Sequence, residues 1–245
     1  GHFFAPNSLV DENDRRVMWG WIRGFPADRG WNGVLTVPRV LSLNEENHLV
    51  QTPLPKLEEL RTSHAKATEI QLTDESSVLL DLTKTSVDIV GRFYPGSAER
   101  VGLRAGCDAS GDCAVSVEFD GERVIANDHE APFNLPPGEE LNIRILLDNA
   151  TAEVYVNGRV CFSFVVPYDA ERTAVRAFAT GGNAKLLSLD TLEMSGIFLN
   201  EQPVVGWMTI PGRDPLPRPG GPTQGRFRTP YSARITSSTS STSTE

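Results

Sequence analysis

The chain has 245 residues, of which 39% are hydrophobic and 22% charged, enough for one large or two small globular cores. Its 23 lysines and arginines are outnumbered by 32 aspartates and glutamates, and the net charge of −9 argues against nucleic acid as a partner. Three cysteines are too few for a disulfide-rich scaffold, and no apolar run approaches the roughly 18 residues of a membrane-spanning helix, so we expect no membrane partner.

Residues 1–50 are rich in tryptophan and turn-forming residues, and their pattern predicts short strands. Arg16–Ile22 pairs with the segment before it, Gly33–Arg39 forms a strand that Val40–Leu43 continues, and Leu49–Gln51 forms another. So few short strands cannot bury a core of their own. We therefore expect this region to be the end of a larger β structure whose beginning is not in the sequence.

Residues 51–65 are predicted to be a linker between two domains. Pro53 and Pro55 interrupt the strand pattern because proline has no backbone N–H for a sheet ladder. The residues that follow, Lys-Leu-Glu-Glu-Leu-Arg, favour a short helix.

Residues 66–198 show the period of two that is typical of strands. The clearest predicted strands are Val101–Ala105, Val115–Phe119, Leu141–Leu147, Ala152–Val156, Val160–Val166, Val175–Ala179 and one that contains Leu187 and Leu189. Asn157 and Gly158 favour a type I′ turn, which makes residues 152–166 a hairpin. No helical period separates these strands, so the predicted fold is an antiparallel β-sandwich.

Residues 199–245 form a tail of different composition. They hold seven of the 17 prolines and end in a run of serine and threonine. Too little apolar surface is available to offset the entropy of ordering, so we expect disorder. Residues 204–210 carry enough apolar side chains to dock back as one short strand.

The cysteines leave one question open. Cys107 and Cys113 flank a predicted turn, and the sequence allows either a disulfide across a hairpin or two free thiols. Cys161 is expected to be a free, half-buried thiol on its strand.

Three motifs follow one another at the start of the chain. They are F-F-A-P-N-S-L-V-D at Phe3–Asp11, W-G-W within Arg16–Ile22, and G-W-N-G-V-L-T-V-P-R at Gly30–Arg39. A linker-like stretch at Pro53–Arg61 and an E-V-Y-V-N-G hairpin within Ile143–Gly158 come later. Together these blocks resemble glycoside hydrolase family 32, which includes invertases, levanases and other β-fructofuranosidases.

The resemblance covers about residues 1–195 and implies a fold and an activity. The family fold is a five-bladed β-propeller followed by a β-sandwich, so residues 1–50 would be the last part of the propeller and residues 66–198 the sandwich. The reaction would be retaining hydrolysis of a β-fructofuranoside (sucrose, inulin or levan type), with no metal or organic cofactor. The partners would be a fructose-containing oligo- or polysaccharide and the missing propeller blades, carried by the same full-length chain or by a second chain.

The catalytic residues of the family are not found. Its nucleophile lies in W-(M/L)-N-D-P-N-G and its acid in an E-C motif, and neither motif occurs here. Arg213-Asp214-Pro215 spells the motif of its stabilising aspartate, but it lies in the proline-rich tail, where we interpret it as a coincidence. We therefore assign no catalytic residue and no metal ligand, and we expect this chain alone to be inactive.

Two sets of residues have competing interpretations. The resemblance places His2 where many family members have a lysine that contacts sugar, and the alternative is a solvated terminal residue. Trp19, Trp21, Trp31 and Trp207 are candidates for stacking on sugar rings, but we favour roles in a core or an interdomain seam.

The E-V-Y-V-N-G hairpin also occurs in lectin-like sandwiches. The alternative function is therefore a non-catalytic, carbohydrate-binding β-sandwich. The strand pair at residues 3–22 argues against it, because such a module has no evident use for these strands.

Overall fold

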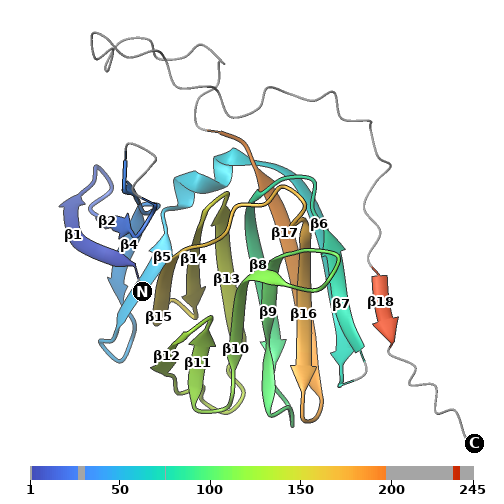
Figure 1. Cartoon of the computed structure of the whole chain (residues 1–245). Coiled ribbons are helices and arrows are strands. Elements are labelled where there is room, and N and C mark those ends of the chain that lie inside the picture. The colour runs from blue at the N-terminus through green and yellow to red at the C-terminus, as the bar shows by residue number, and fades with distance from the viewer. Residues whose placement is uncertain (1, 27–30, 75, 197–233, 238–245) are drawn as a thin grey trace, which may run out of the picture.

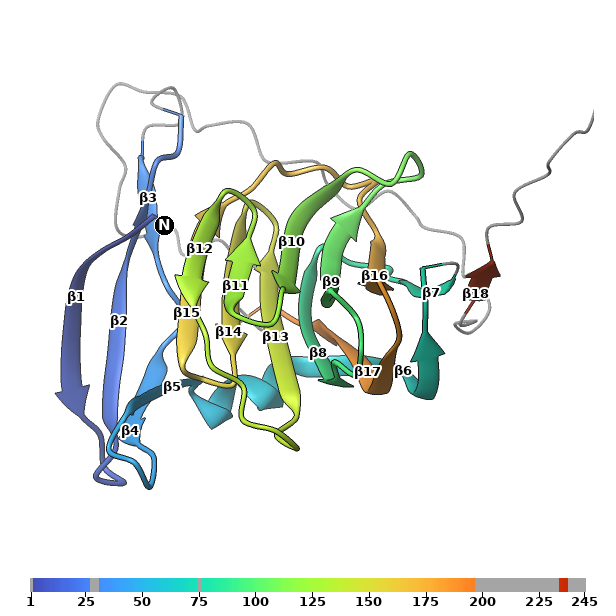
Figure 2. The same ribbon diagram turned by 90° about the horizontal axis from the view of Figure 1, so that it is seen from below.

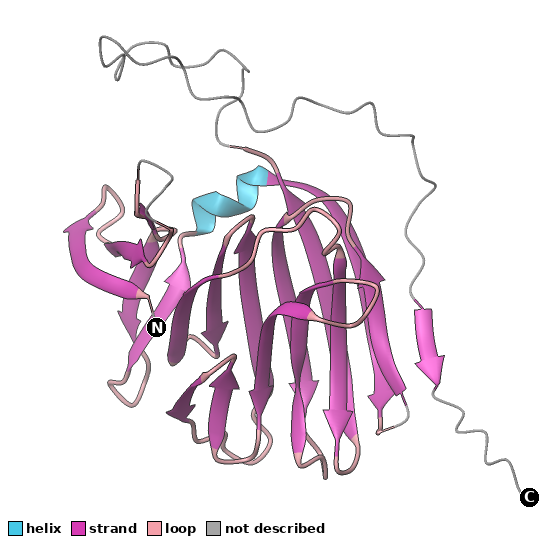
Figure 3. Cartoon of the chain, viewed as in Figure 1, coloured by secondary structure: helices cyan, strands magenta, loops and turns pink. Residues whose placement is uncertain are grey.

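The computed structural model describes residues 2–26, 31–74, 76–196 and 234–237, and most of them lie in antiparallel strands (Figure 1). Figure 3 shows that the described part has a single helical segment, the 3₁₀ helix η2 (Pro55–Leu60). No helix in these residues has the length and hydrophobicity that a membrane crossing requires.

The N-terminal part folds as one five-stranded sheet. Its strands are β1 (Phe3–Val10), β2 (Arg16–Arg23), β3 (Gly33–Leu35), β4 (Arg39–Leu43) and β5 (Leu49–Pro53). The order is β1-β2-β4-β5, and β3 also pairs with β2. This sheet is open, with β1 and β5 at its edges.

The strand expected to run through Gly33–Arg39 and on to residue 43 is broken in two, and this prediction was wrong. Thr36 and Gly20 form two hydrogen bonds. The Thr36 N–H donates to the Gly20 carbonyl, and the Thr36 hydroxyl accepts from the Gly20 N–H. Val37 donates its N–H to a side chain elsewhere, and Pro38 has no N–H to donate. The ladder on β2 therefore stops after Leu35 and resumes at Arg39.

The predicted linker is largely structured. The strand β5 extends to Pro53, η2 begins at Pro55, and the next strand, β6, begins at Arg61. Only the 3₁₀ helix and Leu54 separate the five-stranded sheet from the sandwich.

The sandwich consists of two packed sheets (Figures 1 and 2). The six-stranded sheet has the order β15-β14-β13-β8-β17-β6, and the other has the order β12-β11-β10-β9-β16-β7-β18. The strands are β6 (Arg61–Leu72), β7 (Ser76–Asp81), β8 (Ser86–Tyr94), β9 (Arg100–Cys107), β10 (Cys113–Phe119), β11 (Arg123–Ala126), β12 (His129–Pro132), β13 (Leu141–Asp148), β14 (Thr151–Val156), β15 (Val160–Val165), β16 (Ala174–Thr180), β17 (Ala184–Met194) and β18 (Arg234–Ser237).

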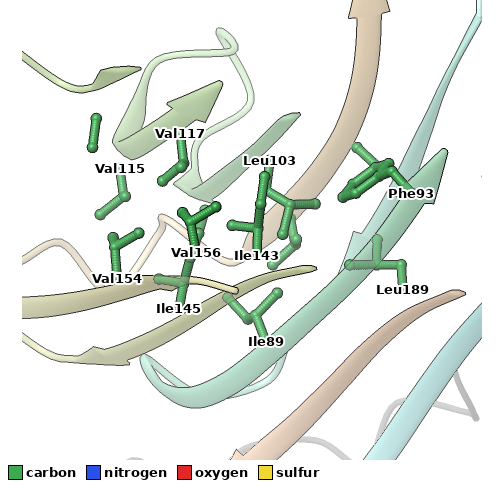
Figure 4. Packing of buried hydrophobic residues seen from close by; sticks show 14 of the residues in the cluster. Ile89, Phe93, Leu103, Val115, Val117, Ile143, Ile145, Val154, Val156 and Leu189 are labelled. Carbon is green, nitrogen blue, oxygen red and sulfur yellow. The ribbon is translucent and has the colours of Figure 1, made fainter. Parts of the chain in front are cut away.

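The hydrophobic core lies between these two sheets (Figure 4). Ile143, Ile145 and Ile89 on the six-stranded sheet and Leu103 and Val117 on the facing sheet have no exposed surface. Burial of each such side chain contributes about 1.5–3 kcal/mol. The all-β sandwich expected from the period of two is confirmed.

The structure also shows the conformation of the predicted hairpin turn and the state of the three cysteines. Asn157 (φ 47°) and Gly158 (φ 66°) both have the positive φ of a type I′ turn, which confirms the hairpin β14–β15. Cys107 and Cys113 face each other across the β9–β10 ladder and form a disulfide. Cys161 is free and half-buried.

The last predicted strand, which contains Leu187 and Leu189, is confirmed as β17. Leu189 is buried in the core, whereas Leu187 is only half-buried. The β17–β8 ladder shifts register between Leu186 and Ser188, so that Leu187 is the extra residue of a bulge. The bulge reverses the alternation and brings Leu186 and Leu189 into the core.

The tail contributes one described segment. Residues 234–237 form β18, which pairs with β7, so the expected disorder does not extend to these four residues. The short strand expected at residues 204–210 lies outside the described residues.

Candidate functional site

The five-stranded sheet is joined to the edge of the six-stranded sheet, where β15 and β14 lie (Figures 1 and 2). Backbone hydrogen bonds cross this junction at two places. The N–H of His2 donates to the Ser163 carbonyl over 3.0 Å, and the N–H of Gln51 donates to the Gly158 carbonyl over 2.8 Å. The hairpin β14–β15 is thus held along its outer side by the N-terminal strands.

A buried ion pair lies at the centre of the junction. Arg39 on β4 and Glu153 on β14 are 2.7 Å apart, and their side chains are only 3% and 5% exposed. Glu153 also accepts hydrogen bonds from the Val37 N–H and from the Tyr155 hydroxyl. A second bond from Arg39 reaches the Ser163 hydroxyl on β15. The carboxylate therefore has the hydrogen-bond partners that a buried charge needs, whereas the guanidinium is paired through its terminal nitrogens and its Nε has no hydrogen-bond partner among the described residues.

Two aromatic rings pack against the guanidinium group of Arg39. Its guanidinium carbon lies 4.8 Å from the centre of the Phe3 ring and 5.1 Å from that of Tyr155, which are cation–π distances. Burial lowers the pKa of Arg39, but the electrostatic effects of Tyr155 and Glu153 outweigh it and raise the pKa overall. The arginine is therefore held in its charged form.

This pairing was not predicted from the sequence, although both residues lie in quoted motifs. Glu153 and Tyr155 alternate with the core residues Ala152, Val154 and Val156, so a period of two places them on the outer face of the sandwich. The structure covers that outer face with the five-stranded sheet, so all of β14 from Ala152 to Val156 is buried. A glutamate between Ala152 and Val154 in an otherwise apolar strand was the only signal available in the sequence.

His2 is bonded to the sandwich. Its ring Nδ1 accepts the Val165 N–H over 2.9 Å, and its carbonyl accepts the Arg23 N–H over 3.2 Å. With the bond to the Ser163 carbonyl described above, β15 binds both the backbone and the ring of His2. A half-buried residue with these contacts differs from a freely solvated terminus.

The tryptophans lie in different settings. Trp19 and Trp21 are half-buried on β2, whereas Trp31 is 46% exposed and packs against Phe25 with ring centres 4.8 Å apart. Trp207 lies outside the described residues.

A hollow of about 490 Å³ adjoins Trp31 between the five-stranded sheet and the turn from β13 to β14. Its lining includes Trp31, Leu35, Asn149 and Tyr168, and Trp31, Leu35 and Tyr168 are exposed hydrophobic side chains. Aromatic rings beside amide groups suit a carbohydrate ligand.

Five aspartates have a pKa that is shifted away from that of a glycosidase acid. The aspartates whose pKa departs from the ordinary value all have it lowered: Asp11, Asp108, Asp120, Asp128 and Asp190. The hydrogen bond from Ser110 is the main cause of the low pKa of Asp108. Burial raises the pKa of Asp190, but hydrogen bonds from His64 and Lys66 outweigh it. A general acid needs a raised pKa instead.

One pair of nearby carboxylates, Asp120 and Glu130, shares an arginine partner. Asp120 and Glu130 both bind Arg123, each over 2.9 Å. The described residues contain no group of three or more His, Cys, Asp or Glu side chains that could hold a metal ion. Arg213-Asp214-Pro215 lies outside them.

Two family descriptions match consecutive parts of the chain. Residues 1–53 match "Glycosyl hydrolases family 32 N-terminal domain", and residues 56–194 match "Glycosyl hydrolases family 32 C terminal". The boundary between the two matches falls at residues 54–55, at the start of η2.

Curated relatives share this region. A levanase of Bacillus sp. (strain L7) is 28% identical over 230 residues, which cover 82% of this chain and 25% of the levanase. A sucrose-6-phosphate hydrolase of Vibrio alginolyticus is 36% identical over 168 residues, which cover 64% of this chain and 32% of that enzyme. The chain thus spans less than half the length of these relatives.

Solved structures show the same fold. Fructan 1-exohydrolase IIa from Cichorium intybus superposes with a TM-score of 0.71 at 21% identity, covering 80% of this chain and 48% of that one. An exo-inulinase from Aspergillus awamori gives a TM-score of 0.67 at 16% identity, covering 80% of this chain and 43% of the inulinase.

Proposed function

The chain belongs to glycosyl hydrolase family 32, and on this premise we propose that it is part of an enzyme that hydrolyses β-fructofuranosides with retention of configuration. The substrate would be a fructose-containing saccharide of the sucrose, inulin or levan type. The names of the relatives, a levanase and a sucrose-6-phosphate hydrolase among them, support this substrate class.

One observation carries the proposal, the buried ion pair between Arg39 and Glu153. Arg39 lies in the N-terminal family match and Glu153 in the C-terminal match. Their side chains neutralise each other's charge in a junction that excludes water. The two parts are therefore built to act as one unit, as in a propeller enzyme with an attached sandwich. A sandwich that binds sugar by itself has no need of such a junction.

In this proposal no residue of the chain is catalytic, and the catalytic carboxylates come from other blades of the propeller. Those blades would belong to the same full-length chain or to a second chain. Retaining cleavage needs two carboxyl groups about 5–5.5 Å apart, one of them with a raised pKa. The lowered pKa values of the shifted aspartates support this division of roles.

His2 is the substrate contact that we propose for this chain. It stands where the resemblance places a sugar-contacting lysine, and its Nε2 is the ring nitrogen not engaged by Val165.

A chimaera tests the proposal. The segment of the Bacillus levanase that precedes the match is fused to residues 2–196 of this chain, and fructose release from levan is measured. We expect activity from the chimaera and none from this chain alone on sucrose, inulin or levan. Fructose release by the chain alone would contradict the proposed absence of catalytic carboxylates, and an inactive but folded chimaera would contradict the family role.

The alternative is a non-catalytic, lectin-like sandwich. The hollow beside Trp31 and Tyr168 is the observation that favours it. Calorimetric titration of the chain with inulin and levan oligosaccharides separates the two proposals. Binding that Trp31→Ala and Tyr168→Ala both abolish would support the lectin-like function.

A further inference from the structure

The hydrogen bond between His2 and β15 constrains where the imidazole carries its proton. A backbone amide can only donate, so the Nδ1 that accepts the Val165 N–H must present a lone pair. In a neutral imidazole one nitrogen donates and the other accepts. The remaining nitrogen, Nε2, must then carry the proton.

We infer that the sandwich fixes His2 in the Nε2–H tautomer, so that His2 presents a hydrogen-bond donor to a hydroxyl oxygen of the sugar. The inference rests on the proposed function for its ligand, but the tautomer follows from this chain alone. By the resemblance, many family members have a lysine at this position, and its ammonium group only donates. The Nε2–H tautomer keeps that donor character without the charge.

The surroundings of Nε2 leave it available. In the described part of the chain no group forms a hydrogen bond with Nε2. Gly24 lies beside the ring, and a Cβ atom built on it would be 3.7 Å from Nε2. Because Gly24 has a φ of +108°, which strongly favours glycine, a side chain is not expected to cover this edge of the ring.

The buried ion pair holds β15 in place for this role. Ser163, whose carbonyl binds the His2 N–H, accepts a bond from Arg39 through its hydroxyl. Arg39 is in turn fixed by Glu153. His2 is thus bound at three atoms, N, O and Nδ1, two of them to β15. We assign Val165 and Ser163 as positioning residues for the sugar contact.

The first test is the tautomer itself. Long-range ¹H–¹⁵N correlation spectra of the ¹⁵N-labelled chain at pH 8 distinguish protonated from unprotonated ring nitrogens, and a His2→Asn sample assigns the signals among the four histidines. We expect Nε2 to be protonated and Nδ1 not. A signal from Nδ1–H, or one averaged between the tautomers, would overturn the inference.

A pair of substitutions separates the two ring nitrogens. In His2→Asn the amide oxygen takes the place of Nδ1 and still accepts from Val165, while the Nε2 donor is lost. In His2→Gln the amide reaches the place of Nε2, but the Val165 N–H loses its acceptor. We expect hydrogen exchange at Val165 to be at least about tenfold faster in His2→Gln than in the wild type or in His2→Asn. Equal exchange rates in all three proteins would refute the constraint.

The sugar contact is tested in the chimaera described above. There, His2→Asn is expected to raise the KM for levan about tenfold with little change in kcat, because a uniform binding contact is lost. An unchanged KM would refute the contact to sugar. The spectra and exchange rates involve no fructoside, so their failure would leave the proposed function intact, and an inactive wild-type chimaera would leave the tautomer intact.

Discussion

Two glycines of the five-stranded sheet each lie under an aromatic ring. A Cβ atom on Gly20 would come within 2.4 Å of the Phe3 ring, and one on Gly33 within 1.6 Å of the Trp21 indole. The rings fill the space of the missing side chains, an arrangement that stabilises glycine within a sheet. The W-G-W motif therefore has a packing reason, which agrees with a structural role for Trp21.

Cys161 gives a prediction at the scale of one residue. Burial raises the pKa of its thiol to about 12, partly offset by Arg39. Since only the thiolate reacts, labelling by iodoacetamide at pH 8 should be at least about 100-fold slower in the folded chain than in urea. Mass spectrometry of the labelled protein measures this rate.

The same experiment has an internal control. In urea without reductant, one cysteine should be alkylated, because Cys107 and Cys113 form a disulfide. Fast labelling of the folded chain would contradict the burial of Cys161, and three labelled cysteines would contradict the disulfide.

At the scale of elements, the junction depends on the pair formed by β4 and β14. Glu153→Ala leaves Arg39 buried without its partner and removes the acceptor of the Val37 N–H. The expected loss of stability is about 3–5 kcal/mol. Because removing both charges avoids an unpaired one, the double variant R39M/E153L should lose less than the sum of its single substitutions.

Urea unfolding measures these effects. Trp19, Trp21 and Trp31 all belong to the N-terminal part, so tryptophan fluorescence in a Trp207→Phe background reports on the five-stranded sheet, while circular dichroism reports on all strands. In Glu153→Ala the fluorescence transition should shift to lower urea. Lys56→Ala, at an ion pair that is 73% and 65% exposed, is the control and should change stability by less than about 1 kcal/mol. Equal stability of Glu153→Ala and this control would disprove the central role of the pair.

A second charged cluster explains why the predicted linker is ordered. Asp88 on β8 has no exposed surface and binds both Arg61 and Arg144. Arg61 also contacts Glu58 of the 3₁₀ helix. The helix is thereby attached to the outer face of the six-stranded sheet, and the chain passes from one sheet to the next without a flexible segment.

At the scale of the whole molecule, exposed apolar side chains are concentrated on the N-terminal part. Its exposed large hydrophobic residues are Phe4, Leu9, Val10, Trp31, Leu35, Leu43 and Leu49. In the described part of the sandwich, the only exposed large hydrophobic residues are Tyr94 and Tyr168. Such a concentration marks a surface that other protein covers, which agrees with a sheet that packs against further blades.

This surface should make the chain self-associate. We expect dye binding typical of exposed apolar surface and an apparent mass that rises with concentration in light scattering. Replacing Leu9, Leu35 and Leu43 by threonine should reduce both, because threonine keeps the strand propensity and removes apolar area. Tyr94→Ser on the sandwich is the control and should change neither. A wild-type chain that stays monomeric and binds no dye would count against a covered surface.

Much of the fold is determined by local sequence. The alternation of Leu141, Ile143 and Ile145 defines a strand whichever partner it finds, and Asn157-Gly158 defines a hairpin turn because both residues tolerate positive φ. The motifs at residues 3–39 also revealed the family before any coordinates. These properties depend on residues a few positions apart.

The tertiary structure decided what depends on distant residues. Arg39 and Glu153 are 114 positions apart, and no local pattern shows that they meet. The burial of both faces of β14 and the bond from Val165 to His2 likewise exist only because a second sheet lies against the sandwich. A period of two shows which side chains share a face, but only packing determines whether that face meets water or protein, and so whether a charge on it is solvated or needs a partner.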